Sequence, residues 1–172
     1  NDIPIGAYWF SYALNKTSAK KEAQTCLGII SKWKIEYPVC FDFEYDSLEY
    51  AKKHGITLTN NDIVEIATTF LTEIENAGYY AMNYSNPDFL NRGFSKLQGR
   101  FDLWLARWAD IKEPGYDCGI WQYSSAGKIN GINGSVDLNV AFKNYPKLIL
   151  KQDEEKQENN KEKAKKIIEE IK

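Results

Sequence analysis

The stretch YPVCFDFEYDS, residues 37–47, decides how this chain folds. Its apolar and aromatic residues predict a buried strand. Within it, however, Asp42, Glu44 and Asp46 place three acids at alternate positions. A buried strand that ends in carboxyl groups needs a reason, because an unpaired charge is costly to remove from water.

Residues two apart in a strand point to the same face, so Asp42 and Glu44 are expected side by side. Phe41 and Phe43 then face apolar packing on the other side. Mutual repulsion and partial burial predict that one of the two carboxyls keeps its proton to a higher pH than usual. Three interpretations remain open: carboxylate catalysis of the kind that glycoside hydrolysis requires, a divalent-metal site, or a solvated strand end.

A further acid, Asp137, lies in the strand-like run GSVDLNVAF, residues 134–142. An isolated strand carboxylate among apolar neighbours needs a partner. It either caps a turn or pairs with a lysine, or it faces Asp42 and Glu44 across the mouth of a closed sheet.

Aromatic residues also gather in or just after the predicted strands. Such rings stack on the apolar faces of sugars, although each one taken singly is more typical of a core. The candidates for substrate binding are Tyr8, Tyr84, Trp104, Trp121 and Tyr123, and Trp108 lies close by.

Strands alternate with helices along the first 145 residues. The pattern predicts strands at 5–13, 37–44, 79–85, 101–108, 119–125 and 134–142, and helices at 18–34, 59–78 and 86–94. Strands that are apolar on both faces indicate a largely parallel sheet or barrel. The helix-poor later strands predict an irregular closure, and catalytic residues of such folds lie at the C-terminal ends of strands.

Size and composition suit one globular domain: the 172 residues are 43% hydrophobic and 27% charged, with a net charge of −2. This charge gives no reason to expect nucleic acid or an anionic membrane as a partner. The sequence contains no apolar run of membrane-spanning length. Its first ten residues, NDIPIGAYWF, lack the basic and apolar regions expected of a signal peptide. The three cysteines are expected to be buried free thiols, and His54, the single histidine, an exposed residue.

The composition changes near residue 147, and the segment KQDEEKQENNKEKAKKIIEEIK, residues 151–172, consists almost wholly of charged and polar residues. This segment is expected to be a solvated helical linker or tail. The alternative, a short coiled-coil or docking helix, has only Ile167, Ile168 and Ile171 to support it. The predicted domains are therefore a barrel over residues 1–146 and a tail over residues 147–172.

Four segments resemble the family-25 glycoside hydrolases, the Chalaropsis-type lysozymes. They are IGAYWFSYA, YPVCFDFEYDS, FDLWLARW and GIWQYSSAGKINGINGSVDLNVAF, which occur in the family's order and cover about residues 3–146. The last segment is the most specific of the four.

The resemblance implies an irregular TIM-like β/α barrel that cleaves the β-1,4 bond between N-acetylmuramic acid and N-acetylglucosamine in peptidoglycan, without a cofactor or metal. By matching position it implies that Glu44 is the proton donor and that Asp42 and Asp137 are supporting carboxylates. It also implies a secreted or cell-wall-associated bacterial enzyme or a phage endolysin.

The sequence departs from the family at two places. Trp9 stands where the family commonly has His. The chain also opens at the family's third strand, so the first part of the barrel and one active-site acid are expected to be missing. A barrel of this kind exposes a strand edge. We expect residues 1–172 alone to be poorly active, unstable or prone to associate through that edge.

A non-catalytic glycan-binding module is the alternative function, and a structural piece that acts through its charged tail is a third. Replacement of Glu44 distinguishes the enzyme from the glycan-binding module, since a binding module has no need of a protonatable carboxyl there.

Overall fold

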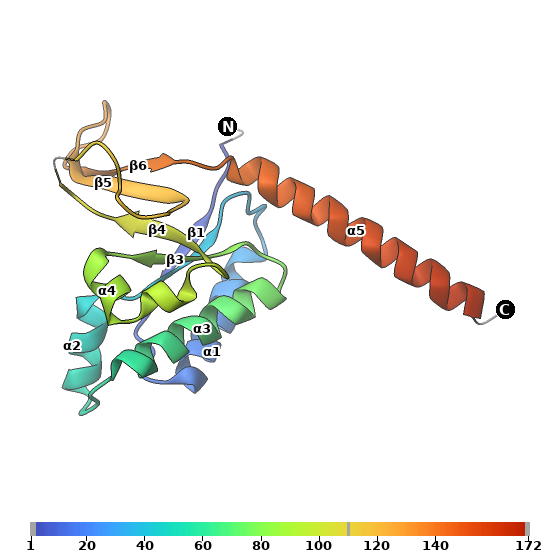
Figure 1. Cartoon of the computed structure of the whole chain (residues 1–172), viewed down its shortest axis with the longest axis horizontal. Coiled ribbons are helices and arrows are strands. Elements are labelled where there is room, and N and C mark those ends of the chain that lie inside the picture. Colours follow the sequence, from blue (N-terminus) through green and yellow to red (C-terminus); the bar gives the residue numbers. More distant parts are fainter. Residues whose placement is uncertain (1–2, 110, 171–172) are drawn as a thin grey trace.

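The computed structural model describes residues 3–109 and 111–170, and for residues 156 and 164–170 it describes the backbone alone. Its centre is one six-stranded sheet with the strands in chain order, β1 to β6 (Figure 1). The first five strands are parallel, and β6 runs antiparallel to β5. The strands are β1 Ala7–Phe10, β2 Val39–Asp42, β3 Ala81–Ser85, β4 Asp102–Ala106, β5 Ile120–Gly127 and β6 Val136–Ala141.

Helices connect the parallel strands and cover one face of the sheet (Figure 1). They are α1 Lys16–Ile30, α2 Tyr45–Lys53, α3 Asn60–Asn76, α4 Pro87–Arg92 and the short 3₁₀ helix η1 Phe94–Leu97. In the described part of the β4–β5 connection there is no helix. The predicted change from helix-linked to helix-poor strands is therefore confirmed.

Local sequence accounts for where the two long helices begin. The Asn15 side chain accepts a hydrogen bond from the backbone N–H of Ser18 at 3.0 Å, which caps α1. Thr59 caps α3 as predicted, and its own N–H donates to the Asp62 carboxylate at 2.8 Å. Each cap satisfies backbone donors that the first turn of a helix leaves unpaired.

Two predictions at the element level were wrong. Residues 45–53 form α2, which was not expected, and β2 ends at Asp42 rather than at Glu44. Glu44 is the N-cap residue of α2, and its backbone N–H donates to the Ser47 hydroxyl at 3.1 Å. The chain thus turns directly from the buried strand into a helix at the acidic residues.

The main core lies between the sheet and the helices. Phe41 and Phe43 of the acidic stretch are fully buried there, and Phe41 packs against Phe70 of α3 with ring centroids 5.2 Å apart. All three cysteines are buried and free, as expected. A smaller cluster on the opposite face of the sheet consists of Cys40, Met82, Ile120 and Tyr145.

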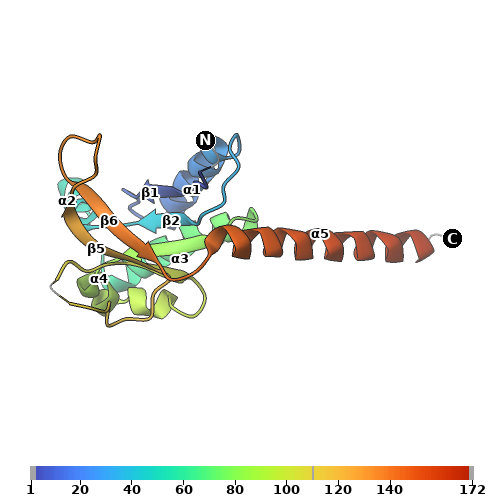
Figure 2. The ribbon, with the colours of Figure 1, turned by 90° about the horizontal axis from the view of Figure 1, so that it is seen from above.

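The sheet remains open in the part of the chain that the structure describes, and the curled half-barrel has β1 and β6 as its two edges (Figure 2). On its concave face, a hollow of about 560 Å³ is lined mainly by apolar groups. These come from β1, β2, β4, β5 and β6 and from the residues just before β1 and β2: Ile3, Pro4, Gly6, Ala7, Tyr8, Tyr37, Pro38, Cys40, Trp104, Ile120, Asn139 and Ala141.

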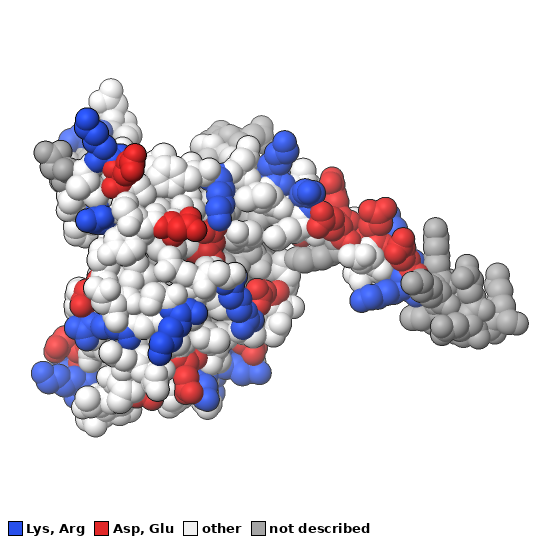
Figure 3. All heavy atoms as spheres, in the orientation of Figure 1, with Lys and Arg blue, Asp and Glu red and all other residues white. Residues whose placement is uncertain are grey.

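The last helix, α5 Tyr145–Glu170, projects away from the rest of the molecule (Figures 1 and 2). Its first residue is anchored, because Tyr145 is fully buried and donates to the Asp102 carboxylate at 2.7 Å. Charges of both signs are interspersed over the visible body and continue along α5 (Figure 3). The side chains of Ile167, Ile168 and Ile171 lie outside the described part. None of the described helices is both long and apolar enough to cross a lipid bilayer.

Candidate active site

A pocket of about 250 Å³ opens at the C-terminal ends of the parallel strands. Its floor is one row of the sheet, in which Phe10 is opposite Asp42, Asp42 opposite Tyr84, and Tyr84 opposite Trp104. In-register parallel strands bring these side chains together although they are far apart in sequence. The remaining lining residues are Tyr8, Glu44, Gln122 and Asp137.

Asp42 and Glu44 share this pocket because the strand and the helix cap hold them on the same side. Asp42 is the last residue of β2 and only 6% exposed, whereas Glu44 is partly exposed. The two carboxyl groups are hydrogen-bonded to each other. The Oδ1 atom of Asp42 is buried and has no hydrogen-bond partner among the described residues. A buried acceptor without a donor is costly, which favours a proton on this carboxyl.

Electrostatics support the same conclusion. Burial, and next the charge of Glu44, raise the pKa of Asp42 from 3.8 to about 8. The pKa of Glu44 is also raised, first by burial and then by the charges of Asp46 and Asp137, although its hydrogen bond with Asp42 opposes the shift. Two neighbouring carboxyls that resist double ionisation hold one proton between them near neutral pH.

The third acid reaches the pocket from the antiparallel part of the sheet. Asp137 lies on β6 and is exposed, but it lines the same pocket as Asp42 and Glu44. The β5–β6 pairing is irregular, with register shifts between Gln122 and Ser124 and between Ser124 and Gly127. Such irregularities change which way side chains point near a sheet's end. Of the alternatives for Asp137, the structure favours a position facing the acid pair.

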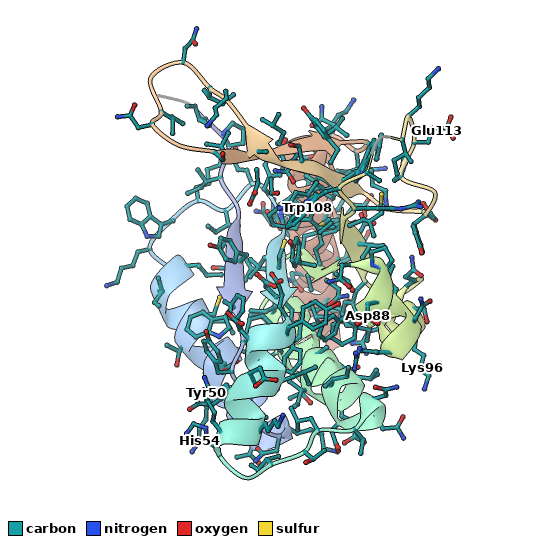
Figure 4. The ribbon with its side chains drawn as sticks, turned by 90° about the vertical axis from the view of Figure 1, so that its left-hand side faces the viewer. Tyr50, His54, Asp88, Lys96, Trp108 and Glu113 are labelled. Atoms are coloured by element: carbon teal, nitrogen blue, oxygen red, sulfur yellow. The ribbon has the colours of Figure 1, made fainter. Side chains whose placement is uncertain are left out.

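Polar and aromatic groups enclose the acids on the β3–β5 side. The Tyr84 hydroxyl and the Trp108 indole N–H both donate to Gln122 Oε1, at 3.2 and 2.9 Å. Burial, and next the charges of Glu44 and Asp42, raise the pKa of Tyr84, so its hydroxyl stays protonated. The Trp104 ring packs edge-on against Tyr84, with centroids 5.1 Å apart. Figure 4 shows Trp108 close to the β5–β6 hairpin.

Two predicted binding residues lie elsewhere. Trp121 is buried in the core between sheet and helices, where its indole N–H donates to the Arg107 carbonyl at 3.0 Å. Tyr123 packs on Trp121, with centroids 5.7 Å apart, and does not line the pocket. The reason is strand alternation: Gln122 points to the concave face, so its two neighbours point away from it.

The sequence interpretation missed Phe10 and Gln122 as lining residues. Alternation provides a signal for both. Phe10 is two residues after Tyr8 on β1, and Gln122 lies between the two aromatics of WQY. The first residues of β5 are buried on both faces of the sheet, so the pattern of apolar residues in the sequence does not show which face carries the site.

The metal interpretation finds no support in the geometry. Within residues 3–109 and 111–170, no group of three or more His, Cys, Asp or Glu side chains is arranged to hold a metal ion. His54 is exposed on the surface, as predicted, at the end of α2.

The fold is a mainly parallel, open α/β sheet whose C-terminal edge carries three acids and several aromatic rings. These are the groups that a glycoside hydrolase uses. The family model for "Glycosyl hydrolases family 25" matches residues 1–132. The chain therefore belongs to family 25 of the glycosyl hydrolases. Comparison with curated protein sequences gives no significant match.

Solved structures share the fold. GHIP, a glycosyl hydrolase 25 of Streptococcus pneumoniae, matches with a TM-score of 0.66 and 22% identity over 81% of this chain and 59% of its own. A family 25 glycosyl hydrolase from Bacillus anthracis has a TM-score of 0.66 and 20% identity over 87% of this chain and 69% of its own. The modular Cpl-1 endolysin, solved with a peptidoglycan analogue, has a TM-score of 0.61 and 24% identity over 81% and 39%.

This chain thus spans between 39% and 69% of the length of these three neighbours. At such identities the likeness establishes the half-barrel fold. Family membership rests on the match over residues 1–132.

Proposed function

We propose that the protein hydrolyses the β-1,4 bond between N-acetylmuramic acid and N-acetylglucosamine in bacterial peptidoglycan. The observation that carries this proposal is the Asp42–Glu44 pair, which holds one proton inside an aromatic-lined pocket. A protonated carboxyl next to an ionised one is what glycoside hydrolysis needs. Family membership and the peptidoglycan analogue bound to the Cpl-1 endolysin support the same substrate.

We assign the proton transfer to Glu44, which is the more exposed member of the pair. In the free chain the two carboxyls share one proton across their hydrogen bond, because burial raises the pKa of both. Glu44 is the member of the pair that presents this proton to the substrate. Glu44 then protonates the leaving oxygen as the glycosidic bond breaks. Asp137 and the ionised Asp42 stabilise the positive charge that develops on the sugar ring. A water molecule supplies the new oxygen at the anomeric carbon, and the proton that this water loses restores the shared proton of the Asp42–Glu44 pair.

The aromatic walls give the pocket its fit for a sugar. Tyr8, Tyr84 and Trp104 line it together with the acids. Their rings provide apolar faces for pyranose rings, and the protonated Tyr84 hydroxyl provides a donor or acceptor for sugar oxygens. We assign substrate binding to these three residues.

The site of action follows from the substrate. We propose that the protein acts on the bacterial cell wall, as a secreted or wall-associated enzyme or as a phage endolysin. Structural neighbours include endolysins and a spore cortex lytic enzyme of Clostridium perfringens. We also propose that residues 1–146 form the catalytic unit and that residues 147–172 form a solvated helical linker.

We further propose that copies of the chain associate through the β1 edge. This strand pairs with β2 alone among the described strands, which leaves one side of its backbone unpaired. Ile3 and Ile5 at the same edge are 71% and 42% exposed. An apolar, unpaired strand edge is a template for pairing with another chain.

The test of the enzymatic proposal is release of new reducing ends from purified peptidoglycan by the chain and by Glu44→Gln. We expect the substitution to lower the initial rate by roughly 10²- to 10⁴-fold, the usual contribution of a general acid. Glu49→Gln is the matched control, because Glu49 lies exposed on the same helix, α2.

Equal rates for the chain and for Glu44→Gln would contradict the assigned role of Glu44. If neither releases reducing ends while both still sediment with peptidoglycan, the glycan-binding module is the better description. Circular dichroism of each variant shows that the compared proteins are equally folded.

A further inference from the structure

Four aromatic rings form a continuous series that starts in the acidic pocket. The ring centroids of Phe10 and Tyr12 are 5.2 Å apart, those of Tyr12 and Tyr50 are 4.9 Å apart, and those of Tyr50 and His54 are 4.1 Å apart. We call Phe10, Tyr12, Tyr50 and His54 the aromatic ladder. It joins the end of β1 to α2, the helix that Glu44 caps.

The ladder is continuous with the proposed catalytic pocket. Phe10 lines that pocket and is opposite Asp42 in the β1–β2 register. From Phe10 the rings proceed over the surface of α2, where Figure 4 shows Tyr50 and His54 close together and far from Trp108.

The middle of the ladder is exposed to solvent. Tyr12 is 43% exposed and Tyr50 is 36% exposed. Neighbouring rings are tilted by 47°, 53° and 39° rather than stacked in parallel, and the contacts between them leave part of Tyr12 and part of Tyr50 open to solvent. A run of exposed aromatic rings that continues from a pocket is typical of a binding surface.

Hydrogen bonds hold the ladder in place. The backbone N–H of Tyr12 donates to Glu22 Oε1 at 3.0 Å, and the buried Ser11 hydroxyl donates to Glu22 Oε2 at 2.6 Å. At the other end, His54 Nδ1 is 2.8 Å from the Tyr50 carbonyl oxygen. These bonds fix the backbone at Tyr12 and the orientation of the His54 ring, which lowers the cost of ordering this surface when a ligand binds.

We propose that the aromatic ladder binds the glycan strand beyond the bond that is cleaved. Successive sugar rings contact the solvent-exposed parts of Tyr12 and Tyr50, and the two hydroxyls bond to sugar oxygens. The inference rests on the proposed function, since it takes the ligand of the acidic pocket to be a glycan. It assigns to this chain an extended subsite for long glycan strands.

The experiment measures binding rather than cleavage, in the Glu44→Gln background, so that the glycan stays intact. The probes are a disaccharide and an octasaccharide of alternating N-acetylglucosamine and N-acetylmuramic acid, titrated by calorimetry. We expect Tyr12→Ala with Tyr50→Ala to weaken octasaccharide binding about tenfold, which corresponds to about 1.4 kcal/mol, with little change for the disaccharide.

Two controls separate ring contact from folding. Tyr12→Phe with Tyr50→Phe keeps the rings and should retain most of the octasaccharide affinity. Trp33→Ala removes a 64% exposed ring outside both the pocket and the ladder, and should change neither titration. Thermal unfolding of each variant checks that the fold is intact.

Equal weakening for both probes, no weakening for the octasaccharide, or no glycan binding at all would overturn the ladder proposal. Failure of the enzymatic proposal is distinguishable from these results. In that case the unsubstituted chain releases no reducing ends, whereas the octasaccharide still binds in a ladder-dependent manner.

Discussion

Asp42 combines a functional position with a local cost in stability. Its carboxyl is buried, is hydrogen-bonded to a second acid and has one oxygen without a hydrogen-bond partner among the described residues. Folding therefore raises its pKa from 3.8 to about 8. Between these two values the folded chain binds more protons than the unfolded chain, so the free energy of unfolding falls as the pH rises.

Replacement of this residue should therefore stabilise the protein. We expect Asp42→Asn to raise the free energy of unfolding at pH 8 by roughly 1–2 kcal/mol, as removal of a destabilised site residue commonly does. The gain should be smaller at pH 5, where the carboxyl of the unsubstituted chain is protonated when folded. Urea unfolding at both pH values measures this, with Asp117→Asn, an exposed residue outside the pocket, as the control. A loss of stability at pH 8 would contradict the assigned burial cost.

At the residue scale, the sequence predicts part of the site. The alternation of Asp42 and Glu44 with Phe41 and Phe43 correctly places the acids in one pocket and the rings in the core. It does not distinguish Gln122 from the aromatics on either side, because β5 begins with residues buried on both faces. Contacts between distant segments, such as the one between Trp108 and Gln122, leave no local pattern at all.

At the scale of elements, a polar anchor on the concave side fastens α5 to the sheet. Asp102 Oδ2 accepts hydrogen bonds from the Tyr145 hydroxyl, Lys143 Nζ and the Tyr80 hydroxyl, at 2.7, 2.8 and 3.2 Å. Burial by itself would raise the pKa of Asp102, but the bonds from Lys143 and Tyr145 lower it overall. A lowered pKa means that this contribution to stability is present at neutral pH and is lost in acid.

The anchor needs a glycine beside it. A Cβ atom at Gly119 would overlap the Tyr145 hydroxyl and would lie 2.6 Å from Asp102 Oδ2. We expect Gly119→Ala to lower the free energy of unfolding by about 1–3 kcal/mol, the usual cost of overpacking. Gly28→Ala is the matched control: it lies in α1 with no atom within 4 Å of the added Cβ, and should stabilise by roughly 0.5–1 kcal/mol. Urea unfolding compares the two variants. Equal changes in the free energy of unfolding would contradict the close packing of Tyr145 and Asp102 against Gly119.

The elements differ in how well their sequences specify them. The helix α3 has a capping box and a continuous apolar face, and it was predicted to within two residues at each end. The helix α2 is short, and its sequence YDSLEYAKK follows directly on the predicted strand without a Gly or Pro boundary. Its position depends on Glu44 as the N-cap, which is apparent only once β2 is known to end at Asp42.

At the scale of the whole molecule, the open sheet is the main feature. The sequence predicts a largely parallel sheet or barrel that closes irregularly, because helical segments become scarce in its last part. The chain order of the strands and the antiparallel β6 are seen only in the structure. The concave face is only partly covered: α5 contributes Tyr145 at one end, and an apolar hollow of about 560 Å³ remains beside β1. Exposed apolar area of this kind favours association, because burying it releases water from apolar groups.

Association through β1 makes a measurable prediction. We expect sedimentation velocity to show a species larger than the monomer that grows with protein concentration. Ile3→Lys with Ile5→Lys should lower the association constant at least tenfold, because lysine at a strand edge opposes pairing with a second chain. Ile29→Lys is the matched control, since Ile29 is 56% exposed on α1, away from the edge.

The reducing-end assay shows whether this association matters for catalysis. If a second copy covers the hollow, the specific activity of the unsubstituted chain should rise with concentration over the range in which the larger species forms. The Ile3→Lys with Ile5→Lys variant should show no such rise. A chain that stays monomeric at every concentration would refute association through β1. A dimer that the two lysines leave unchanged would place the contact on another surface of the molecule.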